Sequence, residues 1–283
     1  MLPGPTPGTP RALTGPRGFA VVDVEATGRS PWRHRVVEIA VVLLNERLCP
    51  EGEFATLLDP LGPVGPTHVH RIRQTDVEGA PRFREIAPRL LELLAGRVLV
   101  GHHVSCDHAF LDREFARIGV PLPPVPLLCT MQLAREHLPE ARSHGLAACV
   151  EAAGLGWYPA HTALGDARVT AELLRHCVGA PSCPPDDWAG PLQEAARVPW
   201  PRLGWARCRS SGAPVPLVRR EALYGPRLPD DRSSEVVLTQ AGAVTPPPRE
   251  RGGLPLGPVD PHDGQALTAV GRQATGATAG STA

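Results

Sequence analysis

The chain has 283 residues, of which 42% are hydrophobic, so it is long enough to bury at least one sizeable core. Its 34 Pro and 29 Gly residues bring it close to a low-complexity composition, which indicates that part of the chain does not fold. The 29 basic residues, all of them Arg, balance 29 acidic residues. A net charge of zero excludes a protein that holds nucleic acid by bulk electrostatics alone.

The cysteines and the apolar runs indicate the compartment. The seven cysteines include no C-x-x-C pair, which argues against a zinc ribbon or a disulfide framework. No stretch approaches the roughly 18 consecutive apolar residues that a membrane span needs. We therefore expect a cytoplasmic protein that does not interact with membranes.

Proline density divides the chain into parts. Residues 1–18 carry five prolines, 19–178 carry 13 and 179–283 carry 16, so the central segment is the expected packed domain. We expect a disordered N-terminal segment before it, an extension of unknown role at 179–245 after it, and a disordered tail at 246–283.

The predicted elements begin with strands. Two Val-rich runs at 19–25 and 36–44 are typical of buried strands, and a third at 53–58 follows closely enough to predict an antiparallel meander. The pattern then changes to a helical stripe at 83–95 and a short strand at 97–100. Further helical patterns cover residues 107–118, 130–137, 144–153 and 164–177. This order predicts an α/β fold, in which a mixed sheet (antiparallel meander, then parallel strands) is flanked by helices.

Two carboxylates lie on the first predicted strand, which is otherwise apolar. Asp23 and Glu25 are two residues apart, so the alternation of a strand directs both to one face. Carboxylates on one face resist burial unless a cation neutralises them, and Mg²⁺ prefers such oxygen ligands. The pair alone is equally consistent with a solvated strand end at the rim of the sheet.

Two further acids lie near helix starts. Asp107 follows strand 97–100, and Asp166 lies near the start of the last amphipathic helix, with His161 five residues upstream on a loop. Acids in a first helical turn are also favoured by capping and by the helix dipole, so neither is diagnostic by itself.

Taken in order, these segments resemble the motifs of the DEDDh, or DnaQ-like, class of 3′→5′ exonucleases, which includes the proofreading epsilon subunit of bacterial DNA polymerase III and its free-standing homologues. Residues 19–28 (FAVVDVEATG) are similar to the first motif, 101–107 (GHHVSCD) to the second and 161–167 (HTALGDA) to the third. Between them, 69–72 (VHRI) resembles the His-Gly-Ile loop of the family. The resemblance covers 19–178 and implies a ribonuclease-H-like exonuclease domain with a poorly defined C-terminal extension.

The resemblance also implies a site. The four carboxylates would bind two Mg²⁺ or Mn²⁺ ions and promote phosphodiester hydrolysis: Asp23, Glu25, Asp107 and Asp166. His161 would be the general base that takes the proton of the attacking water. The product would be a nucleoside 5′-monophosphate.

Further residues are implied to bind the terminal nucleotide. Glu25, Ala26 and Thr27 would contact it at its 3′-hydroxyl. Arg71 departs from the family, which has Gly at this position, so Arg71 either contacts a phosphate or marks a changed pocket. A second departure is His103, where the family usually has Asn, and it bears on the support of Asp107.

Two interpretations remain open for the C-terminal extension. Residues 186–240 contain enough aromatic residues for a small subdomain folded onto the nuclease. Arg207, Arg209, Arg219 and Arg220 lie beside those aromatics, where they could contact single-stranded nucleic acid. A loosely ordered extension is equally consistent, and truncation near residue 185 is then expected to leave a folded, active nuclease.

The sequence thus predicts a metal-dependent 3′→5′ exonuclease that acts on single-stranded or frayed DNA 3′ ends in proofreading or repair, in a polymerase or repair assembly. One alternative keeps the chemistry and changes the substrate to RNA, as in ribonuclease T or oligoribonuclease. Another is an adaptor module that binds nucleic acid without cleaving it, although the intact set of acids argues against this.

Overall fold

The computed structural model describes residues 15–179, 188–203 and 217–220. All of these lie in the first of two units defined by internal contacts, 1–244, and the second unit, 245–283, lies outside the described residues. The tail that we expected to be disordered is therefore outside them too. None of the described helices is long and apolar enough to cross a membrane.

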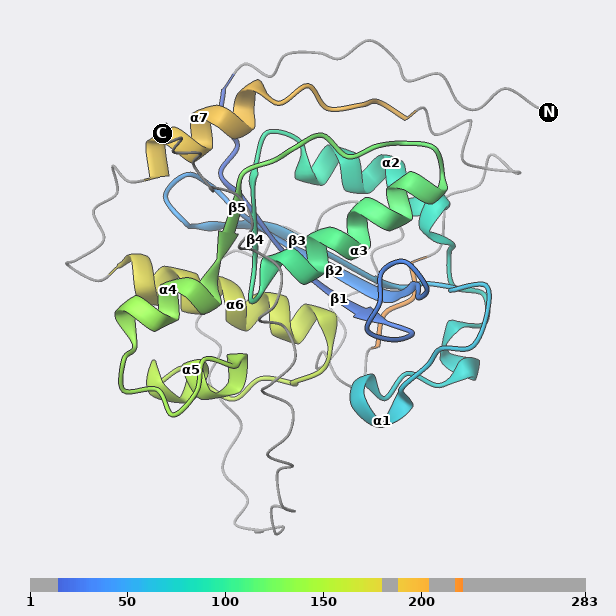
Figure 1. Cartoon of the computed structure of the whole chain (residues 1–283), viewed down its shortest axis with the longest axis horizontal. Coiled ribbons are helices and arrows are strands. Elements are labelled where there is room, and N and C mark those ends of the chain that lie inside the picture. The colour runs from blue at the N-terminus through green and yellow to red at the C-terminus, as the bar shows by residue number, and fades with distance from the viewer. Residues whose placement is uncertain (1–14, 180–187, 204–216, 221–283) are drawn as a thin grey trace, which may run out of the picture. The chain divides into compact units, whose positions relative to one another are not determined.

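A five-stranded mixed sheet forms the centre of the described unit (Figure 1). Its strands are β1 (Phe19–Ala26), β2 (Val36–Leu44), β3 (Pro50–Leu57), β4 (Val98–Gly101) and β5 (Leu127–Cys129). Their order is β3-β2-β1-β4-β5; the first three pair antiparallel, whereas β4 pairs parallel with both β1 and β5. The predicted meander followed by parallel strands is confirmed. β5 was not predicted, since three residues are too few to show a periodicity.

The helices follow the predicted order. They are α1 (Thr67–His70), the short 3₁₀ helix η1 (Gln74–Val77), α2 (Phe83–Leu94), α3 (Val104–Arg117), α4 (Thr130–His137), α5 (Leu146–Ala152), α6 (Ala163–Val178) and α7 (Ala189–Arg197). The helical patterns predicted α2 to α6. They missed α1 and η1, which are single turns, and α7.

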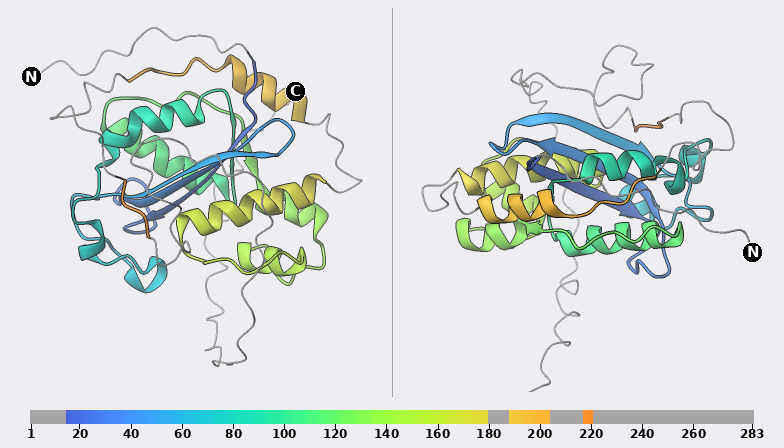
Figure 2. Two further views of the ribbon diagram at one scale, coloured as in Figure 1. Left: turned by 180° about the vertical axis from the view of Figure 1, so that it is seen from behind. Right: turned by 90° about the horizontal axis from the view of Figure 1, so that it is seen from above.

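Helices cover both faces of the sheet (Figure 2). Successive side chains of a strand point to opposite faces, so Ala20 and Val22 pack in the cluster that contains α2 and α3. Phe19 and Val21 pack in the cluster that contains α6 and α7. Because both faces are covered, β2 is buried along its whole length, which explains why its sequence is apolar except for Glu38.

Described parts of the C-terminal extension belong to these cores. Leu192 and Ala195 of α7 are buried in the α6 cluster, and the ring of Trp188 meets that of Phe19 edge to face at 6.5 Å. Trp200 is buried in the α2 and α3 cluster. Residues beyond 178 therefore add apolar area to both faces of the sheet, while the boundary at 178 itself stays a prediction.

Gly65, which lies against the backbone that follows β1, is at a position that should require glycine. Gly65 has φ +87°, and a Cβ there would lie 2.2 Å from the Thr27 carbonyl oxygen. Gly79 has a similar φ of +76° but open space around it. Gly65→Ala should reduce the free energy of unfolding by about 1–3 kcal/mol more than Gly79→Ala, because only the first also displaces backbone. Urea denaturation measures both losses, and equal losses would contradict the clash.

Candidate active site

The first pair of carboxylates lies at the carboxyl end of β1. Phe19 and Val21 face α6, and Asp23 and Glu25 continue the same alternation on that face. β1 and β4 are parallel, so their carboxyl ends lie at one edge of the sheet. This edge is where α3 begins and delivers the third carboxylate.

Asp107 connects α3 to β1. It lies in the first turn of α3, is 8% exposed, and its Oδ1 accepts a hydrogen bond from the Val24 backbone N–H at 3.2 Å. His103 precedes the helix with φ +79°, a left-handed conformation in which Asn and His are enriched. Its ring Nδ1 lies 3.2 Å from Cys106 Sγ, and within the described part of the chain it forms no hydrogen bond to Asp107.

The fourth carboxylate and the histidine lie at the start of α6. The His161 backbone N–H donates to Asp166 Oδ2 at 3.1 Å, and the Thr162 hydroxyl caps the helix by accepting from the Gly165 N–H at 3.1 Å. Glu25, His161 and Asp166 each offer a ligand atom, and these atoms all lie within 4.8 Å of one another. Within the described ranges, they form the one cluster of this kind that could hold a metal ion.

The four carboxyl groups destabilise one another's charged forms. Burial and then the neighbouring carboxylates, Asp107 first, raise the pKa of Asp23 well above its usual value. Burial and the charge of Asp166 raise the pKa of Glu25 to about 8. Burial also raises the pKa values of Asp107 and Asp166 to about 7. Crowded, desolvated carboxylate oxygens are the donors that hard divalent cations prefer, so this set fits Mg²⁺ or Mn²⁺.

A fifth carboxylate, which the sequence reasoning missed, lies beside them. Glu38 is directly opposite Glu25 on β2 and is only 1% exposed. It forms a buried ion pair with Arg220, whose Nε donates to Oε1 at 3.0 Å. The positive charge of Arg220 opposes the burial that raises the pKa values of Glu25 and Asp166.

A sequence signal existed for only one partner of this pair. A single acid in the apolar run 36–44 indicates a buried, paired carboxylate for Glu38. Nothing in the sequence indicated its partner. The interpretation that Arg220 contacts nucleic acid is wrong, because its guanidinium is buried inside the domain. Arg207 and Arg209 lie outside the described residues.

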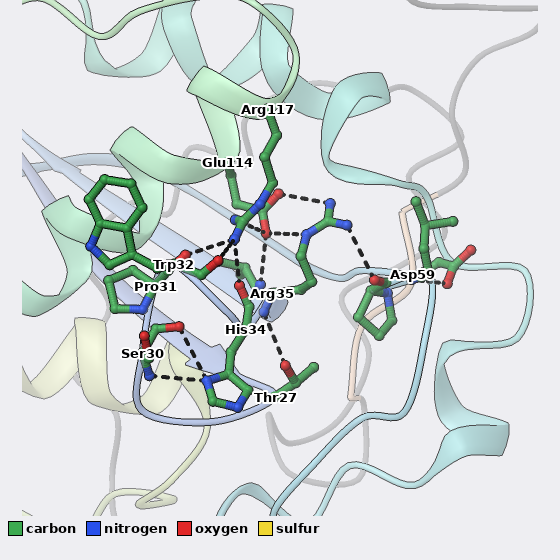
Figure 3. A network of polar contacts seen from close by, with 12 residues as sticks. Thr27, Ser30, Pro31, Trp32, His34, Arg35, Asp59, Glu114 and Arg117 are labelled. Carbon is green, nitrogen blue, oxygen red and sulfur yellow. Dashed lines mark hydrogen bonds and ion pairs between the residues drawn. The ribbon is translucent and has the colours of Figure 1, made fainter.

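The loop after β1 carries Thr27, a predicted substrate-binding residue, and is held by charged side chains of α3 (Figure 3). Thr27 Oγ1 accepts a hydrogen bond from the Arg35 N–H at 3.0 Å. The Arg35 guanidinium donates to both carboxylate oxygens of the buried Glu114, at 2.8 and 2.9 Å. Arg117 donates to three carbonyls of the loop, those of Pro31, Trp32 and His34. The backbone beside the carboxylates is therefore fixed at both ends.

The remaining predicted substrate-binding residues lie on either side of this region. Ala26, the last residue of β1, is half-buried against the α2 and α3 cluster. Arg71 is exposed, follows α1 with φ +61°, and makes no side-chain hydrogen bond or ion pair with other described residues. The left-handed conformation is one that favours glycine, which accounts for the Gly of the family motif. The preceding His70 is buried, and its Nδ1 accepts from the Ile72 N–H at 3.0 Å.

The fold and the site define a class of protein. Residues 20–174 match the model of the RNase_T family, which is described as an exonuclease family, and the chain belongs to it. The resemblance to DnaQ-like DEDDh exonucleases is thereby confirmed.

Particular relatives cover different shares of the chain. The DNA polymerase III subunit epsilon of Aquifex aeolicus is 31% identical over 159 residues, which are 55% of this chain and 78% of that protein. A DNA polymerase III PolC-type protein of Clostridium perfringens is 30% identical over 175 residues, 59% of this chain but only 12% of that protein. E. coli exonuclease I in complex with a dT13 oligonucleotide has the same fold, with a TM-score of 0.51 and 17% identity over 57% of this chain and 41% of that one.

The raised pKa values predict how stability depends on pH without metal. The fold favours the protonated carboxyls, so their stabilising contribution is complete below pH about 4 and is lost as the pH rises through about 7 to 8. In EDTA, the unfolding temperature should therefore fall between pH 5 and 8.5, and Mn²⁺ at pH 8 should restore it. Asp166→Asn should flatten this dependence, whereas Glu172→Gln, an exposed change on α6, should not. A stability that rises over this range would contradict the crowding.

Proposed function

We propose that the protein is a metal-dependent 3′→5′ exonuclease that removes nucleotides from DNA ends. The observation that carries the proposal is the convergence of four carboxylates, from β1, α3 and α6, at one edge of the sheet. The backbone N–H of His161, beside them, donates to one of the four, Asp166. Membership of the exonuclease family supports this reading of the cluster.

The carboxylates are proposed as the ligands of two Mg²⁺ or Mn²⁺ ions: Asp23, Glu25, Asp107 and Asp166. When bound, such ions polarise the scissile phosphodiester and offset the charge that develops on its oxygens. The protein fixes the ligand positions, since the Val24 N–H holds Asp107 and the His161 N–H holds Asp166.

His161 is proposed as the general base. Its side chain is exposed on the loop before α6, and histidine is the side chain best suited to exchange protons near neutral pH. It would take a proton from the attacking water as the water oxygen bonds to phosphorus and the bond to the 3′ oxygen breaks. The released product is then a nucleoside 5′-monophosphate.

Recognition of the terminal nucleotide is proposed for the end of β1. Glu25, Ala26 and Thr27 would contact the 3′-hydroxyl, and the Arg35 and Glu114 contacts keep this backbone in place. Recognition of an end needs few phosphate contacts, which is consistent with the zero net charge of the chain.

DNA is the proposed substrate, single-stranded or frayed at its 3′ end. The relatives that support it are a DNA polymerase III subunit by name and an exonuclease crystallised with a DNA oligonucleotide. Association with a polymerase or repair assembly is also proposed, on the basis of the DNA polymerase III relatives, although the chain covers only 12% of the PolC-type relative. The expected cytoplasmic location stays a prediction.

A digestion assay tests this function. With Mg²⁺ or Mn²⁺, the protein should shorten a 5′-labelled DNA oligonucleotide stepwise and release nucleoside 5′-monophosphates. Asp166→Asn should abolish the reaction, and His161→Gln should lower kcat by about 10²–10⁴-fold, the usual contribution of general base catalysis. Glu172→Gln serves as the control on the same helix.

The outcomes separate the alternatives. Faster shortening of the matching RNA would support an exoribonuclease of the ribonuclease T or oligoribonuclease kind instead. Binding of both the DNA and the RNA oligonucleotide without any shortening would support an adaptor module. Unchanged kcat in Asp166→Asn would overturn the metal-ligand assignment.

Arg71 gives a separate prediction. If it contacts a phosphate of the substrate, Arg71→Gly should raise KM several-fold, leave kcat unchanged and reduce the dependence of KM on salt. Arg71→Ala separates the charge from the backbone, because it removes the guanidinium and retains a Cβ in the left-handed conformation. If neither variant alters turnover or affinity, Arg71 is a surface residue only.

A further inference from the structure

The C-terminal segment 217–220 lies beside β3, along the side of the sheet. β3 is the outermost strand on its side, and the Leu57 N–H donates to the Val218 carbonyl at 2.7 Å. The Val218 N–H in turn donates to Thr56 Oγ1 at 3.1 Å. In Figure 2 this segment, drawn in orange, lies beside the sheet, far in sequence from the strand that it meets. These bonds fix the backbone that carries Arg220.

Arg220 reaches from this segment into the interior. Its side chain is 7% exposed and bridges three parts of the domain. The guanidinium pairs with Glu38 of β2, donates to the carbonyl of His70, the last residue of α1, and donates through Nη2 to the His161 carbonyl at 3.0 Å. The last contact joins the extension directly to the backbone of the residue proposed as general base.

His161 has a backbone that needs such support. Its φ is +61°, a left-handed conformation that is unfavourable for a residue with a side chain. Its N–H is held by Asp166 and its carbonyl by Arg220. Glu38 also accepts from the Ala163 N–H at 3.1 Å, so the Glu38 and Arg220 pair holds the loop at two points.

We propose that Arg220 is a positioning residue for His161, and that the C-terminal segment thereby completes an active site whose other parts lie within residues 20–174. The inference rests on the proposed function, because it acts through the general base assigned there. It also implies that truncation near residue 185, which was expected to leave a folded, active nuclease, lowers activity.

Kinetics of single variants test the proposal. Arg220→Ala should lower kcat by about 10–100-fold, the cost of a displacement near 1 Å in a reacting group, and change KM much less. Millimolar guanidinium should restore part of the lost kcat. Arg84→Ala is the control, since Arg84 is exposed on α2 and makes no side-chain hydrogen bond or ion pair with other described residues, and its kcat should be that of the wild type.

A double-mutant cycle separates positioning from general stability. If Arg220 acts through His161, then Arg220→Ala should cause little further loss of kcat in a His161→Gln background. An equal loss in both backgrounds would overturn the proposal. Arg220→Lys keeps a positive charge beside Glu38 but lacks the planar guanidinium that reaches two carbonyls. This variant should therefore fold and still show a lowered kcat. Wild-type kcat in Arg220→Lys would also overturn it.

A spectroscopic readout is independent of cleavage. The imidazole NMR signal of His161, assigned by its absence in His161→Gln, should shift in Arg220→Ala and return towards its original position with guanidinium. An unshifted signal would contradict positioning even if the enzyme is active. A shifted and rescued signal in a protein that cleaves no nucleic acid would instead overturn the proposed function and leave the contact between Arg220 and His161 standing.

Discussion

Electrostatic crowding at one edge of the sheet is the constraint on which the rest of the structure depends. Four carboxylates of the site, and Glu38 beside them, are drawn together against their mutual repulsion. Two of them, Asp107 and Asp166, lie in the first turns of α3 and α6, where the positive end of each helix dipole offsets part of the negative charge. The architecture thus delivers two of the five acids to this edge on helix N-termini, where the helix dipole favours a negative charge.

Pairing of buried carboxylates with arginine is the second recurring device. Three such pairs join elements that are distant in sequence: Glu38 with Arg220, Glu53 with Arg168, and Glu114 with Arg35. Lysine is absent from the chain, so every side-chain cation of this kind is a planar guanidinium that can bind both oxygens of a carboxylate. Such forks fix orientation as well as distance, which suits a scaffold that must hold loops beside a reaction site.

The sequence was informative where a pattern is local. Strand periodicity predicted β1 and the common face of Asp23 and Glu25, and helical periodicity predicted α2 to α6. Contacts between distant segments leave no such periodicity. The position of Arg220 depends on a long-range pair, and the left-handed backbone of His161 depends on support from Asp166 and Arg220, so neither could be predicted from residue spacing.

Glu38 and Arg220 are far apart in the sequence, so their pairing has to wait during biosynthesis. The two partners are 182 residues apart, so a ribosome makes the whole family-matched segment before it makes the guanidinium. Folding that proceeds from the N-terminus first produces a domain in which Glu38 is buried ahead of its partner. Arrival of residue 220 then closes an intramolecular contact at a high effective concentration, independent of how much protein the cell holds. The site that we propose is therefore completed only after residue 220 has been synthesised.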